Sequence, residues 1–361
     1  MTAPTRLRAL RWGVPVVAAA AVTVVATGVF TAQAAPSLPA RTAGQLLVDL
    51  QGAKVDGLSG TVVQDSELGL PELPQAASGG GGASLTSLLT GSHTLRVWYA
   101  GQDKQRVALL DSLGETDVIH NGTNAWMWSS ELNTATHYTV PAGKAGKDQA
   151  DRLPAGVTPQ QAADMALKAL DPTTKVSTDS TLSVAGRSAY ELVLAPKDSR
   201  SLVGSVRLAV DSKTSVPLRV QVFPKNSGNG PAFSVGFTSV SFDVPGASQF
   251  AFNPPPGAKV SQGTLPAAHE RPSAGEVAQA KQGVKTVGSG WTTVAVLPVG
   301  SPANDQNGAL TTFLAQLPRE SGSWGSGRLL QSALVSALLT DDGRLVVGMV
   351  PPELLYTAAG Q

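Results

Sequence analysis

The sequence predicts an α+β fold in which a long antiparallel β meander makes up most of the chain. Apolar and polar residues alternate at a period of two over many short runs between Ser92 and Phe242, which is typical of half-buried strands. Turn-forming residues separate these runs. Glycine (38 residues) and proline (25 residues) are frequent, which favours many turns over long helices.

Composition limits the classes of function. The length of 361 residues suits about two domains, and a content of 42% hydrophobic and 15% charged residues is apolar enough to bury a core. Lys and Arg total 27 and Asp and Glu total 26, so there is no basic footprint and nucleic acid is not an expected partner. The absence of cysteine excludes disulfides, thiol catalysis, thiolate metal sites and a lipid-modified N-terminal cysteine.

Residues 1–34 resemble an export signal. Three arginines lie among the first eleven residues, an apolar run extends from Trp12 to Phe30, and Ala32-Gln33-Ala34 fits the small-x-small cleavage pattern. Cleavage after Ala34 is one interpretation, and an uncleaved membrane anchor is the other. In both cases we expect the rest of the chain to lie outside the cytoplasm, in the cell envelope, a periplasm-like space or the medium.

The region 40–260 contains the predicted meander and two helices. Leu46, Leu47 and Leu50 form one face of a helix at 40–51. Thr158 and Pro159 form the start of a helix at 158–170, whose apolar face includes Met165 and Leu170 and can cover part of the sheet. Gly57–Val63 is interpreted as a turn leading into a strand. The other predicted strands are 95–99, 105–109, 117–120, 126–128, 138–140, 190–194, 206–210, 218–222, 233–237 and 240–242, with Asn121-Gly122 as a hairpin turn and Asn253–Gly257 ending the sheet.

The C-terminal part is predicted to form a second, smaller α+β domain. Residues 261–285 lose the alternation and are interpreted as a linker. The domain itself covers 286–358. Its predicted elements are a strand at 291–299, a helix at 308–317, a strand at 329–339, a turn at 341–343, a strand at 345–350 and a helix at 352–358.

No recognisable catalytic or metal-binding pattern occurs in the sequence. The four histidines are His93, His120, His137 and His269, and no two have the spacing of helical metal ligands. His120 and His137 lie near strand ends and are interpreted as surface residues. No G-x-S-x-G elbow or phosphate-binding loop is present. We therefore expect a binding protein without a metal or cofactor, and not an enzyme.

A sheet of about ten strands with one apolar face has to cover that face or curl around it. With few covering helices, this leaves a concave apolar surface, the usual form of a ligand cavity. The same residues would also form the core of any β domain. The candidate lining residues are Leu95, Val97, Tyr99, Val107, Leu109, Trp126, Trp128, Tyr138, Tyr190, Leu192 and Leu194.

Four segments in order resemble the outer-membrane lipoprotein carrier family (LolA) and the related sigma-factor regulators RseB and MucB. The first is the N-terminal helix followed by Gly57–Val62, and the second is Val118–Trp126 with its Asn-Gly turn. The third is Gly186–Leu194 with the later Val210-Asp211 and Pro217–Arg219, and the fourth is Phe250–Ala258 with the pattern F-x-F-x-P-P-x-G. Together the segments span about residues 40–260.

The resemblance implies an unclosed half-barrel with a cavity for acyl chains and with helices as a lid, in which Met165 and Leu170 would be the lid residues of the helix at 158–170. The implied ligand is a lipid or lipoprotein held without a covalent bond, and a membrane transporter would be a further partner of such a carrier. The alternative is an RseB-like envelope-stress regulator that binds a membrane anti-sigma factor. The C-terminal domain is not part of the simple carrier.

Overall fold

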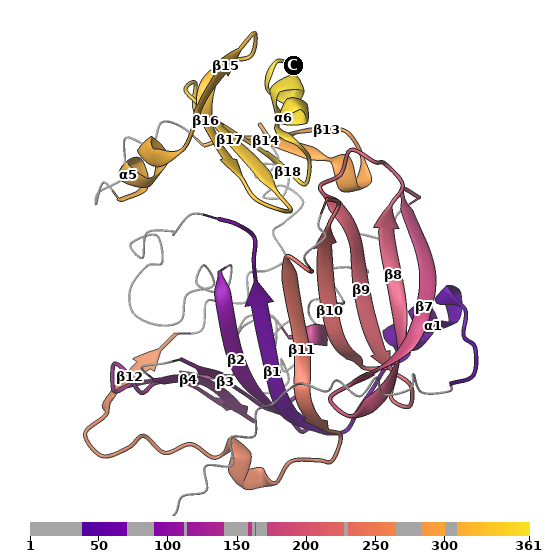
Figure 1. Cartoon of the computed structure of the whole chain (residues 1–361). Helices are drawn as coiled ribbons and strands as arrows, with labels where there is room; N and C mark the ends of the chain where they lie inside the picture. Colours follow the sequence, from indigo (N-terminus) through magenta and orange to yellow (C-terminus); the bar gives the residue numbers. More distant parts are fainter. Residues whose placement is uncertain are drawn as a thin grey trace, which may run out of the picture. The chain divides into compact units, whose positions relative to one another are not determined.

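The computed structural model describes residues 38–70, 90–111, 114–140, 158–160, 163, 172–226, 230–264, 283–299 and 309–361. It contains a sheet of twelve strands and a sheet of six (Figure 1). Three α-helices of eight to ten residues accompany them in this part of the chain. The predicted α+β class, with one large curved sheet and a smaller second unit, is confirmed.

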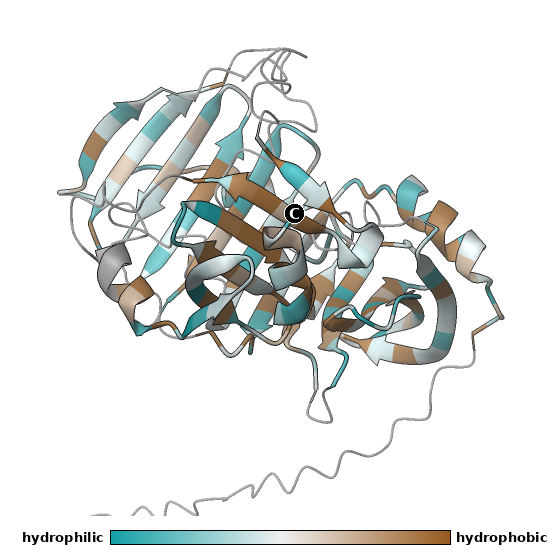
Figure 2. Cartoon of the chain, turned by 90° about the horizontal axis from the view of Figure 1, so that it is seen from above, coloured by the Kyte–Doolittle hydropathy of each residue, from teal (hydrophilic) through white to brown (hydrophobic). Residues whose placement is uncertain are grey.

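The large sheet is open, with the order β12-β6-β5-β4-β3-β2-β1-β11-β10-β9-β8-β7. Its strands are β1 (Leu58–Ser66), β2 (Gly91–Tyr99), β3 (Lys104–Leu110), β4 (Glu115–Asn121), β5 (Asn124–Ser129), β6 (Thr134–Thr139), β7 (Thr174–Val184), β8 (Arg187–Pro196), β9 (Val203–Asp211), β10 (Pro217–Pro224), β11 (Phe233–Ser241) and β12 (Lys259–Gly263). Hydrophobic and hydrophilic segments alternate along its strands (Figure 2). All neighbours are antiparallel except β12, which pairs with β6 in parallel. Neither β7 nor β12 had been predicted.

Local sequence explains two of the tight hairpins. The predicted hairpin between β4 and β5 is present, but its turn is shifted by one residue: Asn121 pairs with Asn124, and the two turn residues are Gly122, with a φ of +61°, and Thr123. Between β7 and β8, both Ala185 and Gly186 have positive φ. A left-handed backbone suits glycine but strains alanine, because its Cβ approaches the following carbonyl oxygen.

One predicted strand break is a β-bulge. The apolar alternation changes phase between Phe237 and Val240, and we interpreted this change as two strands. The structure has a single strand, β11, in which Phe237 pairs with Val62 and Ser239 pairs with Thr61. Thr238 is the extra residue, and it returns Val240 to the same face of the sheet as Phe237.

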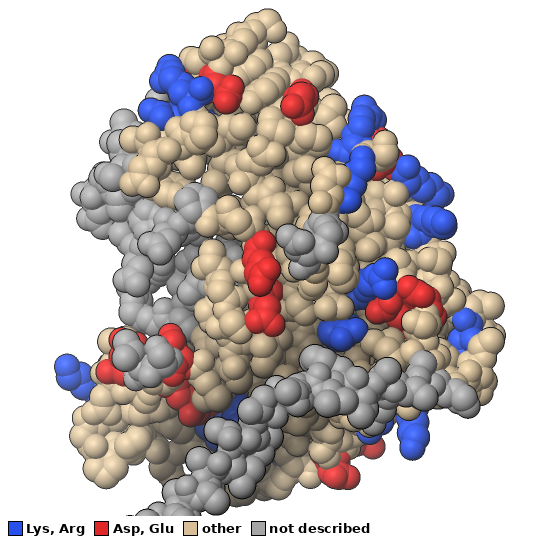
Figure 3. Space-filling view, viewed as in Figure 1, with Lys and Arg blue, Asp and Glu red and all other residues tan. Residues whose placement is uncertain are grey.

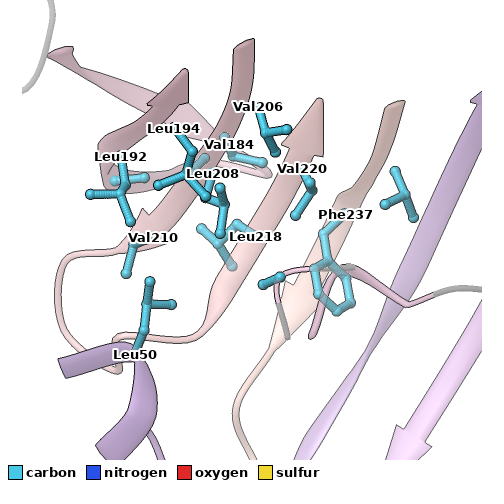
Figure 4. Packing of buried hydrophobic residues seen from close by; sticks show 14 of the residues in the cluster. Leu50, Val184, Leu192, Leu194, Val206, Leu208, Val210, Leu218, Val220 and Phe237 are labelled. Atoms are coloured by element: carbon cyan, nitrogen blue, oxygen red, sulfur yellow. The ribbon is translucent and has the colours of Figure 1, made fainter. Parts of the chain in front are cut away.

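The β7–β10 half of the sheet has a filled core. Helix α1 (Ala43–Gly52) is capped by Thr42 and Gln45 in a capping box, and it starts three residues later than predicted. Its Leu46 and Leu50 join the apolar side chains of β8, β9 and β10, and Leu50 points toward them in Figure 4. Buried apolar area of this kind is the main favourable term in folding.

Of the helix predicted at 158–170, the structure describes only residues 158–160 and 163. Residues 159, 160 and 163 are helical, and Ala163 is buried in the same core. The two lid residues, Met165 and Leu170, lie outside the described residues.

After β11 the chain crosses the sheet and returns to it at the far edge. The crossing segment contains η3 (Ala247–Phe250) and Pro254–Gly257, and it leads into β12. The prediction that the prolines end the sheet is therefore wrong, and residues 261–263 of the predicted linker belong to a strand. The unpaired edge of β6 offers hydrogen-bonding groups that a later segment can use, and periodicity does not reveal this.

The small sheet has the order β13-β14-β18-β17-β16-β15. Its elements are β13 (Lys285–Val287), η4 (Gly290–Thr292), β14 (Val294–Pro298), α5 (Ala309–Gln316), β15 (Arg319–Gly322), β16 (Gly325–Gln331), β17 (Ser336–Thr340), β18 (Arg344–Gly348) and α6 (Pro352–Ala359). The single strand predicted at 329–339 is wrong, since the turn Ser332–Val335 divides it. This turn looked like strand because Ala333 and Leu334 are apolar, and both pack against the core of the large sheet.

The two sheets contact each other directly. The Leu202 N–H donates to the Met349 carbonyl at 2.9 Å, and the indole Nε1 of Trp291 donates to Thr174 Oγ1 at 2.7 Å. Trp291 is buried in the large-sheet core together with Leu334. The division into domains at 261–285 remains a prediction.

Candidate functional site

Strand register separates the two faces of the large sheet. Residues that pair directly across antiparallel strands lie on the same face. Leu95 and Val97 therefore share a face with Val62, and through β11, β10 and β9 with Leu192. We call this the core face, and its opposite the outer face.

Six of the eleven predicted lining residues are buried in the core itself. Tyr190 is 7% exposed, and Leu192 and Leu194 are fully buried. The other three, from β2 and β3, are Leu95, Val97 and Leu109, and they belong to the same apolar cluster. Side chains already surrounded by protein have little surface to offer a ligand, so these six explain stability.

Three predicted residues keep part of their surface exposed on the core face of β2–β6. They are Tyr99, Val107 and Tyr138. The register places Met127 beside them, because Val97, Val107, Val118 and Met127 form one continuous row across four strands. Met127 is also part-exposed. From the alternation we predicted that the two tryptophans of β5 form its apolar face, so Met127 between them was not among the predicted lining residues. We call Tyr99, Val107, Met127 and Tyr138 the β2–β6 surface.

The two tyrosines stand on one row of this surface. Tyr99 pairs with Gln105, which pairs with His120, and the row continues through Ala125 to Tyr138. Within the described chain, neither tyrosine hydroxyl has a hydrogen-bond partner. A tyrosine with an apolar ring and a free hydroxyl suits a boundary between an apolar ligand and water.

A glycine makes room for Tyr138. Gly263 of β12 pairs with Tyr138, and a Cβ built on Gly263 would lie 2.2 Å from Cε1 of the tyrosine ring. The ring therefore lies against the backbone of β12. Gly263 falls inside the predicted linker, and no sequence pattern marked it as part of this surface.

Trp126 and Trp128 lie on the outer face, so the prediction that they line one surface with Leu95 and Val97 is wrong. Trp126 pairs with Ile119 and Trp128 with Asp117, whereas Met127 between them pairs with Val118 on the core face. The crossing segment covers the tryptophans. Phe252 lies 5.4 Å from Trp126 and 5.9 Å from Trp128 between ring centroids.

Arg106, Asp117 and Glu115 form a group of paired charges on the outer face. Arg106 donates to both carboxylate oxygens of Asp117, at 2.8 and 3.1 Å, and stacks on Trp98 with 5.0 Å to the ring centroid. Glu115 lies 3.4 Å from the same guanidinium. Burial, with the neighbouring Asp117, raises the pKa of Glu115, and Arg106 opposes this shift. These pairs hold neighbouring strands together and offer no free acid or base.

The histidines do not form a reactive centre. His120 is only 3% exposed, so its interpretation as a surface residue is wrong, and its Nε2 lies 2.8 Å from the Gly122 carbonyl of the hairpin. His137 lies between Gln262 and Asn124, and its ring packs at a tilt against Trp126 with 4.5 Å between ring centroids. Among the residues that the structure describes, no three His, Asp or Glu side chains are grouped so that they could hold a metal ion.

No helix in the described ranges combines the length and apolar character needed to cross a membrane.

Comparisons with known proteins give matches among solved structures alone. No family model matches the chain, and no curated protein matches it. The chain is similar to a chain of the Pseudomonas aeruginosa MucA/MucB complex, at 16% identity over 88% of this chain and 96% of that one, with a TM-score of 0.41. It is also similar to the LolA superfamily protein NE2245 from Nitrosomonas europaea, at 11% identity over 59% and 99%, with a TM-score of 0.23. A third match is the Mycobacterium tuberculosis lipoprotein LppX, at 10% identity over 54% and 93%, with a TM-score of 0.28.

Identities and TM-scores this low carry no conclusion about function, which has to come from the chain's own residues. Both groups that the sequence resembles, the MucB regulators and the LolA superfamily, are nevertheless represented among the similar solved structures.

Proposed function

We propose that this chain is an exported binding protein that holds an acyl chain of a lipid or lipoprotein, without a covalent bond, on the β2–β6 surface. The observation that carries the proposal is the contrast within one sheet. The core face of β8–β10 is mostly filled by buried side chains, with Val222 part-exposed, whereas Tyr99, Met127 and Tyr138 of β2–β6, and Val107 where it borders the core, remain part-exposed on the same face. Part-exposed apolar side chains grouped on one face mark a binding surface.

The energetics suit a reversible complex. Each methylene removed from water contributes about 0.8 kcal/mol, so ten buried methylenes supply roughly 8 kcal/mol before the cost of ordering the chain. Met127 contributes a flexible, polarisable side chain that adapts to ligands of different shape. The chain has no cysteine, so no thiol of its own can attach the lipid covalently.

A matched pair of variants tests this assignment. Val107 and Val63 are both part-exposed valines in neighbouring regions of the sheet, but Val107 is on the core face and Val63 on the outer face. Val107→Glu places a charge on the proposed surface and should abolish binding of a fluorescent fatty acid. Val63→Glu adds the same charge to the other face and should leave binding unchanged.

The purified wild-type protein should also release lipid on solvent extraction, as detected by mass spectrometry. If extraction yields no lipid and the wild-type protein does not bind the fluorescent fatty acid, the proposal is wrong. Equal losses in Val107→Glu and Val63→Glu would place binding elsewhere. Thermal unfolding of both variants confirms that they are folded.

Export is a separate part of the proposal, since residues 1–34 lie outside the described residues. Expression of the full chain in a bacterial host, followed by mass analysis of the exported protein, would show whether residue 35 is the new N-terminus. Retention of the full mass in the membrane fraction would favour the uncleaved anchor.

The second candidate is an envelope-stress regulator that binds a membrane anti-sigma factor. The two-sheet plan favours it, because the six-stranded sheet is firmly joined to the large one through Met349 and Trp291 and adds surface that an acyl carrier does not need. A pull-down from envelope extract would enrich an anti-sigma factor in this case. Enrichment of lipid without such a protein favours the carrier.

A further inference from the structure

Charge is distributed unevenly between the two halves of the large sheet. Residues 172–226, which contain β7–β10, carry eight Lys and Arg against four Asp and Glu. Residues 58–140, which contain β1–β6, carry three against eight. Residues 35–361 together hold 24 basic and 26 acidic residues, so the positive charge of β7–β10 is a local property and not a reflection of overall composition.

Four exposed cations gather where these strands begin and end at one rim of the sheet. Thr174 pairs with Pro196, and Val203 pairs with Pro224, so these four positions mark the same end of neighbouring strands. Lys175 follows Thr174 in the sequence, Lys197 follows Pro196, and Lys225 follows Pro224. Arg200 lies in the loop between β8 and β9. We call Lys175, Lys197, Arg200 and Lys225 the basic rim, and all four are exposed.

The three lysines of the rim are held in place without being neutralised. Lys197 Nζ donates to the Pro172 carbonyl at 2.6 Å, and Lys225 Nζ donates to the Ser199 carbonyl. A carbonyl orients an ammonium group but cancels none of its charge. In the described ranges, no carboxylate forms an ion pair with Lys175, Lys197 or Lys225.

Asp198 is the one acidic residue in the loop that carries Lys197 and Arg200. It forms a salt bridge with Arg200 at 2.7 Å. Hydrogen bonds from Arg200, with a smaller effect of Lys225, lower the pKa of Asp198 to about 2, so this carboxylate stays ionised and offsets one positive charge of the rim. The rim therefore keeps a surplus of positive charge. In Figure 3, blue side chains predominate along the edge where Figure 1 shows β7–β10.

We propose that the basic rim docks the protein on the anionic headgroups of a membrane. The choice of a membrane as the partner rests on the proposed function. A ligand with an acyl chain is scarcely soluble, so it has to be collected from, or delivered to, a membrane surface. Lysines near an anionic bilayer each strengthen binding, and the effect decays within a Debye length. A surface of few cations gives weak, reversible docking, which suits a protein that leaves the membrane with its ligand.

The test uses the chain without residues 1–34 and two kinds of vesicle. One is pure phosphatidylcholine, and the other contains equal parts of phosphatidylcholine and phosphatidylglycerol. The rim variant is Lys175→Gln with Lys197→Gln and Lys225→Gln. The matched control removes three exposed lysines elsewhere, with Lys54→Gln, Lys213→Gln and Lys259→Gln. Lys213 is the most closely matched control position, because it lies at the opposite end of the same strands, in the turn between β9 and β10.

We expect binding to the anionic vesicles alone, weakened by rising salt. The rim variant should bind roughly 100-fold more weakly, at about fivefold per lysine, and replacing the same lysines by arginine should preserve binding. The control variant, which loses the same net charge, should bind nearly as well as wild type. Thermal unfolding shows that each variant is folded.

Equal binding to neutral vesicles, no vesicle binding at low salt, or the same loss in the control variant would each overturn the docking proposal. Binding of the fluorescent fatty acid is measured on the same samples. A rim variant that keeps the fatty acid but loses the vesicles supports docking. A wild-type protein that binds the fatty acid but never the vesicles refutes docking and leaves the proposed function intact, while the reverse result refutes the proposed function alone.

Discussion

Gly263→Ala is the most informative single substitution in the large sheet. The added Cβ would lie 2.2 Å from Cε1 of Tyr138, whereas carbon atoms in contact keep about 3.5–4.0 Å apart. The overlap exceeds 1 Å, so either the tyrosine ring or strand β12 has to move. Gly263 has no positive φ to preserve, so backbone strain does not contribute to the cost.

Both ways of relieving the overlap have a measurable cost. Rotating the ring removes Tyr138 from the β2–β6 surface, and displacing β12 gives up its parallel pairing with β6. Overpacking of this kind costs about 1–3 kcal/mol. We expect a loss of that size in urea-induced unfolding, together with weaker fatty-acid binding.

A double-mutant cycle isolates the ring as the cause. In a Tyr138→Ala background the ring is absent, so Gly263→Ala should cost almost nothing there. Gly246→Ala serves as the control, because its added Cβ meets no atom closer than 3.9 Å. The reasoning is refuted if Gly263→Ala is equally costly with and without the ring, or if it is as harmless as Gly246→Ala.

Three further predictions concern the crossing segment, a hairpin and the part-exposed acid Glu115. Phe252→Ala removes the ring that covers both tryptophans of β5 and should cost about 1–3 kcal/mol, with a change in tryptophan fluorescence, whereas Phe252→Leu should cost less. Ala185→Gly relieves a residue with φ of +51° and should raise the unfolding free energy by about 0.5–1 kcal/mol; a loss would mean that its methyl contact with the core is worth more than the strain. Burial raises the pKa of Glu115, so its contribution to stability is present at acid pH and is lost as pH rises through its titration. In the Glu115→Gln variant, the midpoint of urea-induced unfolding should therefore fall less than in the wild-type protein as pH rises toward neutrality. If both proteins show the same dependence on pH, the predicted direction is wrong.

The sequence predicted the period of the strands correctly but not always their phase. In β5 the residues Trp126 and Trp128 were expected on the core side because they are large and apolar. The register turns Met127 to that side, and Phe252 covers the tryptophans on the other. A strand with apolar residues on both faces fits either orientation, and only the partner strands decide it.

Contacts between segments that are distant in the sequence could not be predicted, for a different reason. β12 pairs in parallel with β6, more than a hundred residues earlier in the chain, and its residues Lys259–Gly263 carry no strand pattern. The turn Ser332–Val335 was hidden because its apolar residues pack against the large sheet. Local sequence reports local preference, and both features depend on what the rest of the chain supplies.

In the two proposals, the two halves of the large sheet have different functions: β7–β10 docks on the membrane and β2–β6 binds the ligand. The β7–β10 half is filled by leucine and valine side chains and carries surplus cations at its rim, so it is suited to rigid docking. The β2–β6 half keeps apolar side chains part-exposed and carries surplus acidic residues, which an anionic membrane repels. Docking through the basic rim would therefore hold the acidic half away from the headgroups. A ligand would pass between membrane and protein across the sheet, and loading should slow when the rim is neutralised even though equilibrium affinity for the free fatty acid does not change.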